Sequence, residues 1–133
     1  MIKTRRHILL SGALLAALSV ILGAFGAHGL RLLLTPTEMD WWQTGVQYQM
    51  WHALGLAAIA GIPAPRLGLP ASLIGIGTLI FSISLYVLTF THWHWIGFVT
   101  PIGGLMMIAG WVVLAWRARS LVIVRDERDR DPH

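Results

Sequence analysis

The sequence predicts an all-α integral membrane protein, a bundle of four transmembrane helices. Two observations support this prediction. Only 12% of the 133 residues are charged, whereas about a quarter are charged in an average soluble domain. Lys, Arg, Asp and Glu are also absent from residues 7–30, 41–65 and 67–116. A membrane-spanning helix needs about 20 mostly apolar residues, so these intervals hold one, one and two helices respectively.

The composition excludes several classes of function. The chain has no cysteine, which excludes disulfides, thiolate catalysis, cysteine-bound zinc and iron–sulfur clusters. The net charge is +4, but the basic residues concentrate at the two ends of the chain and do not indicate nucleic-acid binding. The length indicates one domain, residues 1–120, and we expect the polar cytoplasmic tail, residues 121–133, to be disordered.

The first span is predicted at residues 8–30, after a basic lead. A cleaved signal peptide is the alternative, since residues 24–26 resemble a cleavage site. The length of the apolar run and the three later spans favour a retained helix. Gly23 and Ala27 lie about one turn apart on one face, and Gly26 lies beside them. Such small-residue faces allow helices to pack closely in lipid.

The second span is predicted at residues 41–62. Its helix begins earlier, because Thr35 is a typical N-cap, Pro36 occupies the first helical position and Glu38 completes a capping box. The tryptophan pair that follows belongs at the membrane surface, where indole rings are enriched.

The third span is predicted at residues 69–90 and the fourth at residues 96–116, joined by a short aromatic turn. In the third span, residues spaced by three and four share one face. We expect this face to point inward: Gly75, Leu79, Ser82, Tyr86 and Thr89. Three glycines of the fourth span mark expected close contacts: Gly103, Gly104 and Gly110.

The loop charges predict the orientation. Basic residues precede the first span and follow the second and the fourth: Lys3, Arg5, Arg6, Arg66, Arg117 and Arg119. The connection between the third and fourth spans contains no Lys or Arg. By the positive-inside rule, the N-terminus and the C-terminus are both cytoplasmic.

His28 and His52 are the leading candidates for function, because ionisable residues within membrane helices are uncommon and often functional. His28 lies in the last turn of the first span, before a candidate C-cap glycine. His52 lies about 15 Å below the level of Trp42. We expect Tyr86 or Ser82 to be its hydrogen-bond partner, in a buried structural network.

A ligand site is the alternative to that network. It would be a site for lipid or quinone lined by His28, Tyr48, His52 and Tyr86. Ser82 and Thr100 complete the possible polar intramembrane site. Haem needs two imidazoles at matching depth, and His28 is predicted to lie shallower than His52, so we expect no haem. His92 and His94 lie in the aromatic turn with no acid nearby, which favours the membrane interface over a metal site.

No catalytic residues are predicted, since no acidic residue lies within a span and no grouping of serine, histidine and acid is visible. No charged side chain lines a span, which disfavours a transporter. We therefore expect a non-enzymatic accessory or scaffold subunit in the lipid bilayer, as a homo-oligomer or in a larger membrane complex. The lipid or quinone site and a small oligomeric channel are the alternatives.

Four segments share a pattern with a known family. They are GAFGAHGL at residues 23–30, YQMWHAL at 48–54, FSISLY at 81–86, and TPIGG at 100–104 with the later Gly110-Trp111. With these segments in order, the chain resembles the small bacterial inner-membrane proteins of the YgdD and YwdK family, a domain of unknown function with eukaryotic transmembrane relatives. Ile83 stands where the family pattern has glycine.

The resemblance implies four spans and a plasma-membrane location. It supplies no substrate, cofactor or reaction. It does imply a set of motif positions that form a candidate site: His28, Tyr48, His52, Tyr86 and Thr100.

Overall fold

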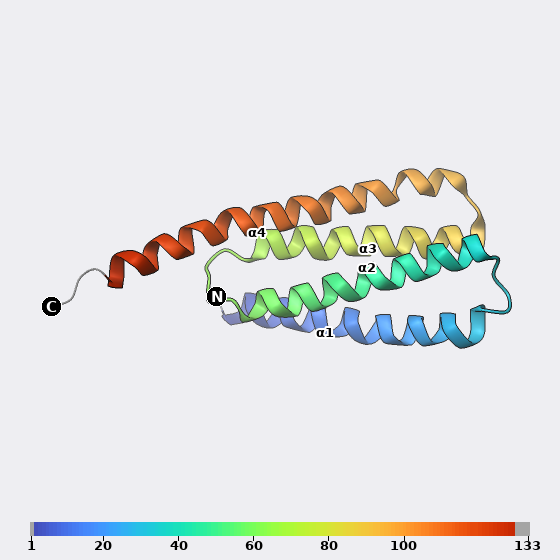
Figure 1. The fold of residues 1–133 in the computed structure, drawn as a ribbon, viewed down its shortest axis with the longest axis horizontal. Coiled ribbons are helices and arrows are strands. Elements are labelled where there is room, and N and C mark those ends of the chain that lie inside the picture. Colours follow the sequence, from blue (N-terminus) through green and yellow to red (C-terminus); the bar gives the residue numbers. More distant parts are fainter. Residues whose placement is uncertain (1, 130–133) are drawn as a thin grey trace.

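The computed structural model describes the chain from residue 2 to residue 129, with side chains through residue 119, and it consists of helices joined by short connections (Figure 1). Within that part of the chain there is no strand. The elements in order are α1 (Ile2–Phe25), the π-helix η1 (Gly26–Leu30), α2 (Pro36–Gly61), α3 (Gly68–Thr91), the 3-10 helix η2 (His94–Phe98) and α4 (Thr100–Asp129).

The helices pack in chain order. Short connections force successive helices to run antiparallel and side by side, so α2 packs on α1, α3 on α2, and α4 on α3 (Figure 1). Within the described residues α1 and α4 do not pack against each other. The outer faces of these two helices are therefore left uncovered, with exposed apolar residues such as Leu14, Leu105 and Ile108, as a lipid-facing surface requires.

Three of the four helices are long and apolar enough to cross a membrane on their own. They are residues 2–30, 68–91 and 94–119. The fourth, α2, has 26 residues, which is about 39 Å of helix, but its polar residues lower its hydropathy. Because α2 packs along α1 and α3, it runs beside two spanning helices. The all-helical membrane fold is thus confirmed, while the orientation of the termini stays a prediction.

The start of α2 follows the sequence signal. Thr35 has an extended backbone and accepts a hydrogen bond at Oγ1 from the amide of Glu38, at 3.3 Å. In return the Thr35 amide donates to Glu38 Oε2 at 2.8 Å. Pro36 occupies the first helical position. This capping box satisfies amides that a helix start leaves without partners.

Some predicted boundaries were wrong. The basic lead is part of α1, which begins at Ile2. The expected C-cap at Gly29 is absent, because the chain continues as η1 and no glycine of the described part has a positive φ. The fourth helix begins at Thr100 after η2, not at residue 96.

The end of α4 also differs from expectation. It was predicted near Trp116, with disorder from residue 121, but the helix continues to Asp129. Leucine, arginine and glutamate in this segment are good helix formers, and they extend the helix past the apolar span. The last part of the predicted tail, residues 130–133, lies outside the described residues.

Glycines bring α3 and α4 into backbone contact. A Cβ on Gly103 would lie 2.5 Å from the Phe81 amide nitrogen, and one on Gly110 would lie 2.6 Å from Ile74 Cγ1. Neither distance is sterically tolerable. The line of contact between α3 and α4, here called the seam, therefore depends on glycine at these two positions. Gly104 differs, since its nearest neighbour would be 3.9 Å away; it lies beside the seam and not within it.

Candidate functional site

The interior of the bundle holds a polar network that joins three helices, and Trp42 is its outermost member. Trp42 is buried, and its indole Nε1 donates to the Leu22 carbonyl of α1 at 3.1 Å. In a regular α-helix that carbonyl would accept a hydrogen bond from the amide N–H of Gly26. Gly26 is the residue at which the π-helix begins. A Cβ on Gly26 would lie 2.5 Å from the same indole nitrogen. The glycine is therefore needed for the indole to reach the backbone.

Gln49 is the centre of the network. It is 3% exposed, and its Nε2 donates to the Leu15 carbonyl of α1 at 3.1 Å. Its Oε1 accepts from the Tyr86 hydroxyl of α3 at 2.9 Å. The Tyr86 ring packs on Trp42 with the ring centroids 4.8 Å apart. One amide thus links α1, α2 and α3 in the apolar interior.

Two serines extend the links between helices. Ser82 of α3 donates to the Gly45 carbonyl of α2 at 2.8 Å. A Cβ on Gly45 would lie 2.7 Å from the Tyr86 ring, so the small residue admits both partners. Ser84 and Thr100 share a hydrogen bond of 2.7 Å that joins α3 to the start of α4.

His52 is bonded within its own helix, so the prediction that Tyr86 or Ser82 would be its partner was wrong. Its Nδ1 lies 2.7 Å from the Tyr48 carbonyl one turn earlier. The imidazole stacks on the Tyr48 ring and lies against Trp111 of α4, with centroid distances of 5.9 and 6.0 Å. Because Nδ1 faces a carbonyl oxygen, it carries the proton and donates. The expected partners bond to α2 at other positions instead.

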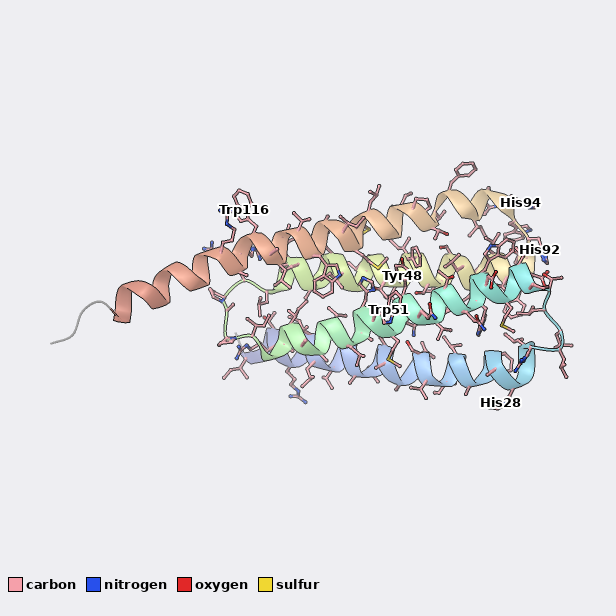
Figure 2. The ribbon with its side chains drawn as sticks, in the orientation of Figure 1. His28, Tyr48, Trp51, His92, His94 and Trp116 are labelled. Carbon is pink, nitrogen blue, oxygen red and sulfur yellow. The ribbon has the colours of Figure 1, made fainter. Side chains whose placement is uncertain are left out.

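His28 is exposed in η1, beyond the end of α1, and is not joined to the Tyr48–His52 pair. Figure 2 places His28 at the end of the bundle and Tyr48 near the middle of α2. The structure therefore does not bring the proposed site residues into one pocket.

The inward face predicted for α3 is wrong at one position. Leu79 is 41% exposed, because that face turns outward at this level of the bundle.

A second polar contact lies outside the apolar interior, between the start of α2 and the end of α3. His92 Nε2 lies 2.5 Å from Glu38 Oε1. The hydrogen bond from the Thr35 amide, and then that from His92, hold the pKa of Glu38 below its usual value of 4.5. His94 lies nearby in η2 (Figure 2). The described residues contain no group of three side chains able to hold a metal ion.

Two glutamines of α2 have no partner in the described part of the chain. Gln43 and Gln47 are exposed and make no hydrogen bond there. They line a shallow groove of about 130 Å³ between α1 and α2, together with Gly23, Gly26 and Ala27. Gly23 has only Val46 nearby, and Ala27 is exposed. The small-residue face of α1 thus remains largely open.

Sequence reasoning missed the two residues that hold the interior together. The sequence predicts Trp42 at the membrane surface and indicates no role for Gln49. The available signal was the spacing of Trp42, Gly45 and Gln49 at three and four residues, which places them on one face of α2. Because the polar groups of Trp42, Gln49, Ser82 and Tyr86 are bonded to other helices, this arrangement serves helix packing.

Comparison with known proteins identifies the chain's relatives. The profile of a family described as "Protein of unknown function (DUF423)" matches residues 22–104. The chain is 44% identical over 106 residues to a UPF0382 membrane protein of Staphylococcus haemolyticus, covering 77% of this chain and 87% of the relative. It is 37% identical over 115 residues to the UPF0382 inner membrane protein YgdD of Escherichia coli, covering 84% and 88%.

A third relative is the UPF0382 membrane protein YwdK of Bacillus subtilis, 41% identical over 108 residues, covering 77% of this chain and 88% of the relative. No solved structure matches the chain significantly. The names of these relatives and the apolar helices agree that this is a multi-pass protein of the inner (plasma) membrane. The chain therefore belongs to the DUF423 (UPF0382) family of membrane proteins of unknown function.

Proposed function

We propose that the protein is a non-enzymatic scaffold subunit that associates with a second copy of itself through the groove between α1 and α2. The observation that supports this most directly is the pair of exposed amides, Gln43 and Gln47, on α2. Gln47 lies seven residues beyond Asp40, about 10 Å further along the helix. At that depth an amide without a partner is costly.

The groove is suited to another helix. Gly23 and Ala27 present no bulky side chain beside the two glutamines, and small residues spaced by four allow membrane helices to approach closely. A side-chain amide is both a donor and an acceptor, so it can pair with its own symmetry mate. A two-fold contact of identical surfaces satisfies both features.

The lipid or quinone alternative has less support. His28 is exposed, and His52, Tyr86 and Ser82 are already bonded to other parts of the chain. No observation favours the channel alternative.

The absence of cysteine from the sequence makes disulfide trapping a direct test of self-association.

The test is Ala27→Cys, oxidised in native membranes. We expect a covalent dimer, because Ala27 borders the groove. The matched control is Leu105→Cys, an exposed position on the outer face of α4, which should remain monomeric. A monomer for both variants, or an adduct of Ala27→Cys with a different protein, would overturn the proposal.

A second test removes one of the two amides, that of Gln47. Gln47→Leu in the Ala27→Cys background should reduce the trapped dimer about threefold, since an interhelical hydrogen bond in a membrane is worth about 0.6 kcal/mol. Gln47→Asn keeps the amide and should retain more of the dimer. Equal trapping by all three proteins would show that the amide plays no part in the contact.

A further inference from the structure

A cavity lined by three arginines lies at the end of the bundle where the α2–α3 connection meets α1 and α4 (Figure 1). Its volume is about 540 Å³, and the arginines are Arg5 of α1, Arg66 of the connection and Arg117 of α4. None of the residues lining the cavity is acidic. Three like charges that converge in this way, with no carboxylate among the lining residues, favour binding of an anion.

The arginines are held in place by backbone groups. Arg5 donates from Nη2 to the Ile62 carbonyl, and Arg117 donates from Nη1 to the Arg66 carbonyl. These bonds to backbone carbonyls hold the two side chains at the cavity. The Nε of Arg5 is buried and has no partner among the residues that the structure describes. A buried N–H without an acceptor is costly, and an oxygen atom of a bound anion would satisfy it.

The start of α3 adds further donors to the cavity. Gly68 and Leu69, in the first turn, both line it. The N-cap residue is Leu67, which forms no side-chain cap, so amides of the first turn lack the usual acceptor. An uncapped helix start next to guanidinium groups suits a phosphate, which Arg binds through paired hydrogen bonds.

An apolar groove continues from the cavity. It has a volume of about 540 Å³ and runs between α1 and α3, and Thr4 and Gly68 line both spaces. Further along, Leu14, Gly75 and Ile76 line the groove. A molecule that fills both spaces therefore carries a phosphate at one end and a hydrocarbon chain at the other, which is the chemistry of a phospholipid.

We propose that the cavity formed by Arg5, Arg66 and Arg117 binds the phosphate headgroup of an anionic phospholipid, whose acyl chain follows the groove between α1 and α3. The site lies on surfaces that the proposed self-association does not use. Failure of one proposal therefore leaves the other standing.

The test is titration of the protein in neutral detergent with phosphatidylglycerol, with phosphatidylcholine and with inorganic phosphate, each followed by native mass spectrometry. We expect phosphatidylglycerol to bind at least tenfold more tightly than either alternative. Inorganic phosphate binding as tightly as the lipid would make this a site for free phosphate and would overturn the acyl-chain part. Equal binding of the two lipids would overturn the anion site.

Variants place the binding in the cavity. Arg66→Gln keeps the backbone bonds of Arg5 and Arg117 and should weaken phosphatidylglycerol binding about fivefold, the value of one basic residue near an anionic membrane. A triple variant removes all three arginines of the cavity: Arg5→Gln/Arg66→Gln/Arg117→Gln. Its matched control removes three exposed arginines outside the cavity: Arg6→Gln/Arg31→Gln/Arg119→Gln.

The two triple variants have the same net charge. We expect the cavity variant to lose phosphatidylglycerol binding and the control to retain it. Equal losses would mean that only overall charge matters, and the proposal would fail.

A separate variant tests the groove. Gly75→Leu narrows it, and the new Cβ has room because its nearest atom would be 3.6 Å away. It should weaken lipid binding without changing binding of inorganic phosphate.

Discussion

Gln49 shows how one polar side chain can organise a membrane protein. It joins a carbonyl of α1 to a hydroxyl of α3 from its place on α2. In hydrocarbon no water competes for these groups, so the bonds fix the relative rotation of the three helices. The surrounding rings of Trp42 and Phe90 pack against the same region, with centroids 5.7 Å apart.

Substitution of Gln49 tests this role. Gln49→Leu leaves the Tyr86 hydroxyl without its acceptor and should lower the free energy of unfolding by about 1–3 kcal/mol. The double variant Gln49→Leu/Tyr86→Phe removes both partners and should recover part of the loss. Thermal unfolding in neutral detergent, followed by tryptophan fluorescence, measures both. A double variant less stable than the single one would contradict the pairing.

The contact between Glu38 and His92 is expected to make stability depend on pH. Because the pKa of Glu38 is lowered in the folded protein, its contribution is complete above the usual value of 4.5 and is lost as the pH falls through the lowered pKa. The melting temperature should therefore decrease below about pH 4.5. In Glu38→Gln this part of the decrease should be absent. An unchanged pH profile would contradict the assignment.

At the level of the helices, the seam between α3 and α4 depends on glycine. Gly77 of α3 and Gly103 of α4 face each other, and a Cβ on either would lie within 2.8 Å of a backbone atom of the opposite helix. Backbone cannot move aside as a flexible side chain can. The separation of α3 and α4 is therefore fixed by the absence of side chains.

Two alanine substitutions test the seam. Gly103→Ala should lower the free energy of unfolding by about 1–3 kcal/mol, because the new methyl group overlaps with the backbone of α3. Gly104→Ala is the matched control, since its Cβ would have 3.9 Å of clearance. It should be neutral or up to about 1 kcal/mol more stable through better helix propensity. Thermal unfolding measures both, and equal losses would contradict the packing.

The orientation of the assembled bundle across the membrane follows from charge. The arginine cavity lies at the end that holds Arg5, Arg66 and Arg117, and the connection at His94 lies at the opposite end (Figure 2). By the positive-inside rule we expect the arginine end to be cytoplasmic. A phosphatase fused after His94 should therefore be active outside the cytoplasm, and one fused to the C-terminus should be inactive. The reverse pattern would contradict the predicted orientation.

Much of the fold was predictable because its causes are local. Charge-free intervals located the four long helices, and Thr35, Pro36 and Glu38 located the start of α2 within a residue. Helix ends were predicted less well. The π-helix begins at Gly26, where α1 meets Trp42 of another helix. The extension of α4 to Asp129 has no apolar signal.

The candidate site was predictable only in part. Tyr86 and Ser82 do bond to α2, but to Gln49 and Gly45 and not to His52. Gln49 and His52 are three residues apart and thus lie about 60° apart around the helix axis. A small rotation of α2 decides which of them meets α3, and no local pattern encodes that rotation.

The amino-acid order alone established that this protein lies in hydrocarbon as four helices, because a membrane core excludes charge and requires every backbone group to bond within its own segment. Three-dimensional packing established the rest. The rotation and separation of the helices brought Gln49 to Tyr86, left His28 exposed, and gathered three arginines from distant parts of the chain into one cavity. Such contacts depend on how whole surfaces fit together, and that fit is not a property of any single stretch of sequence.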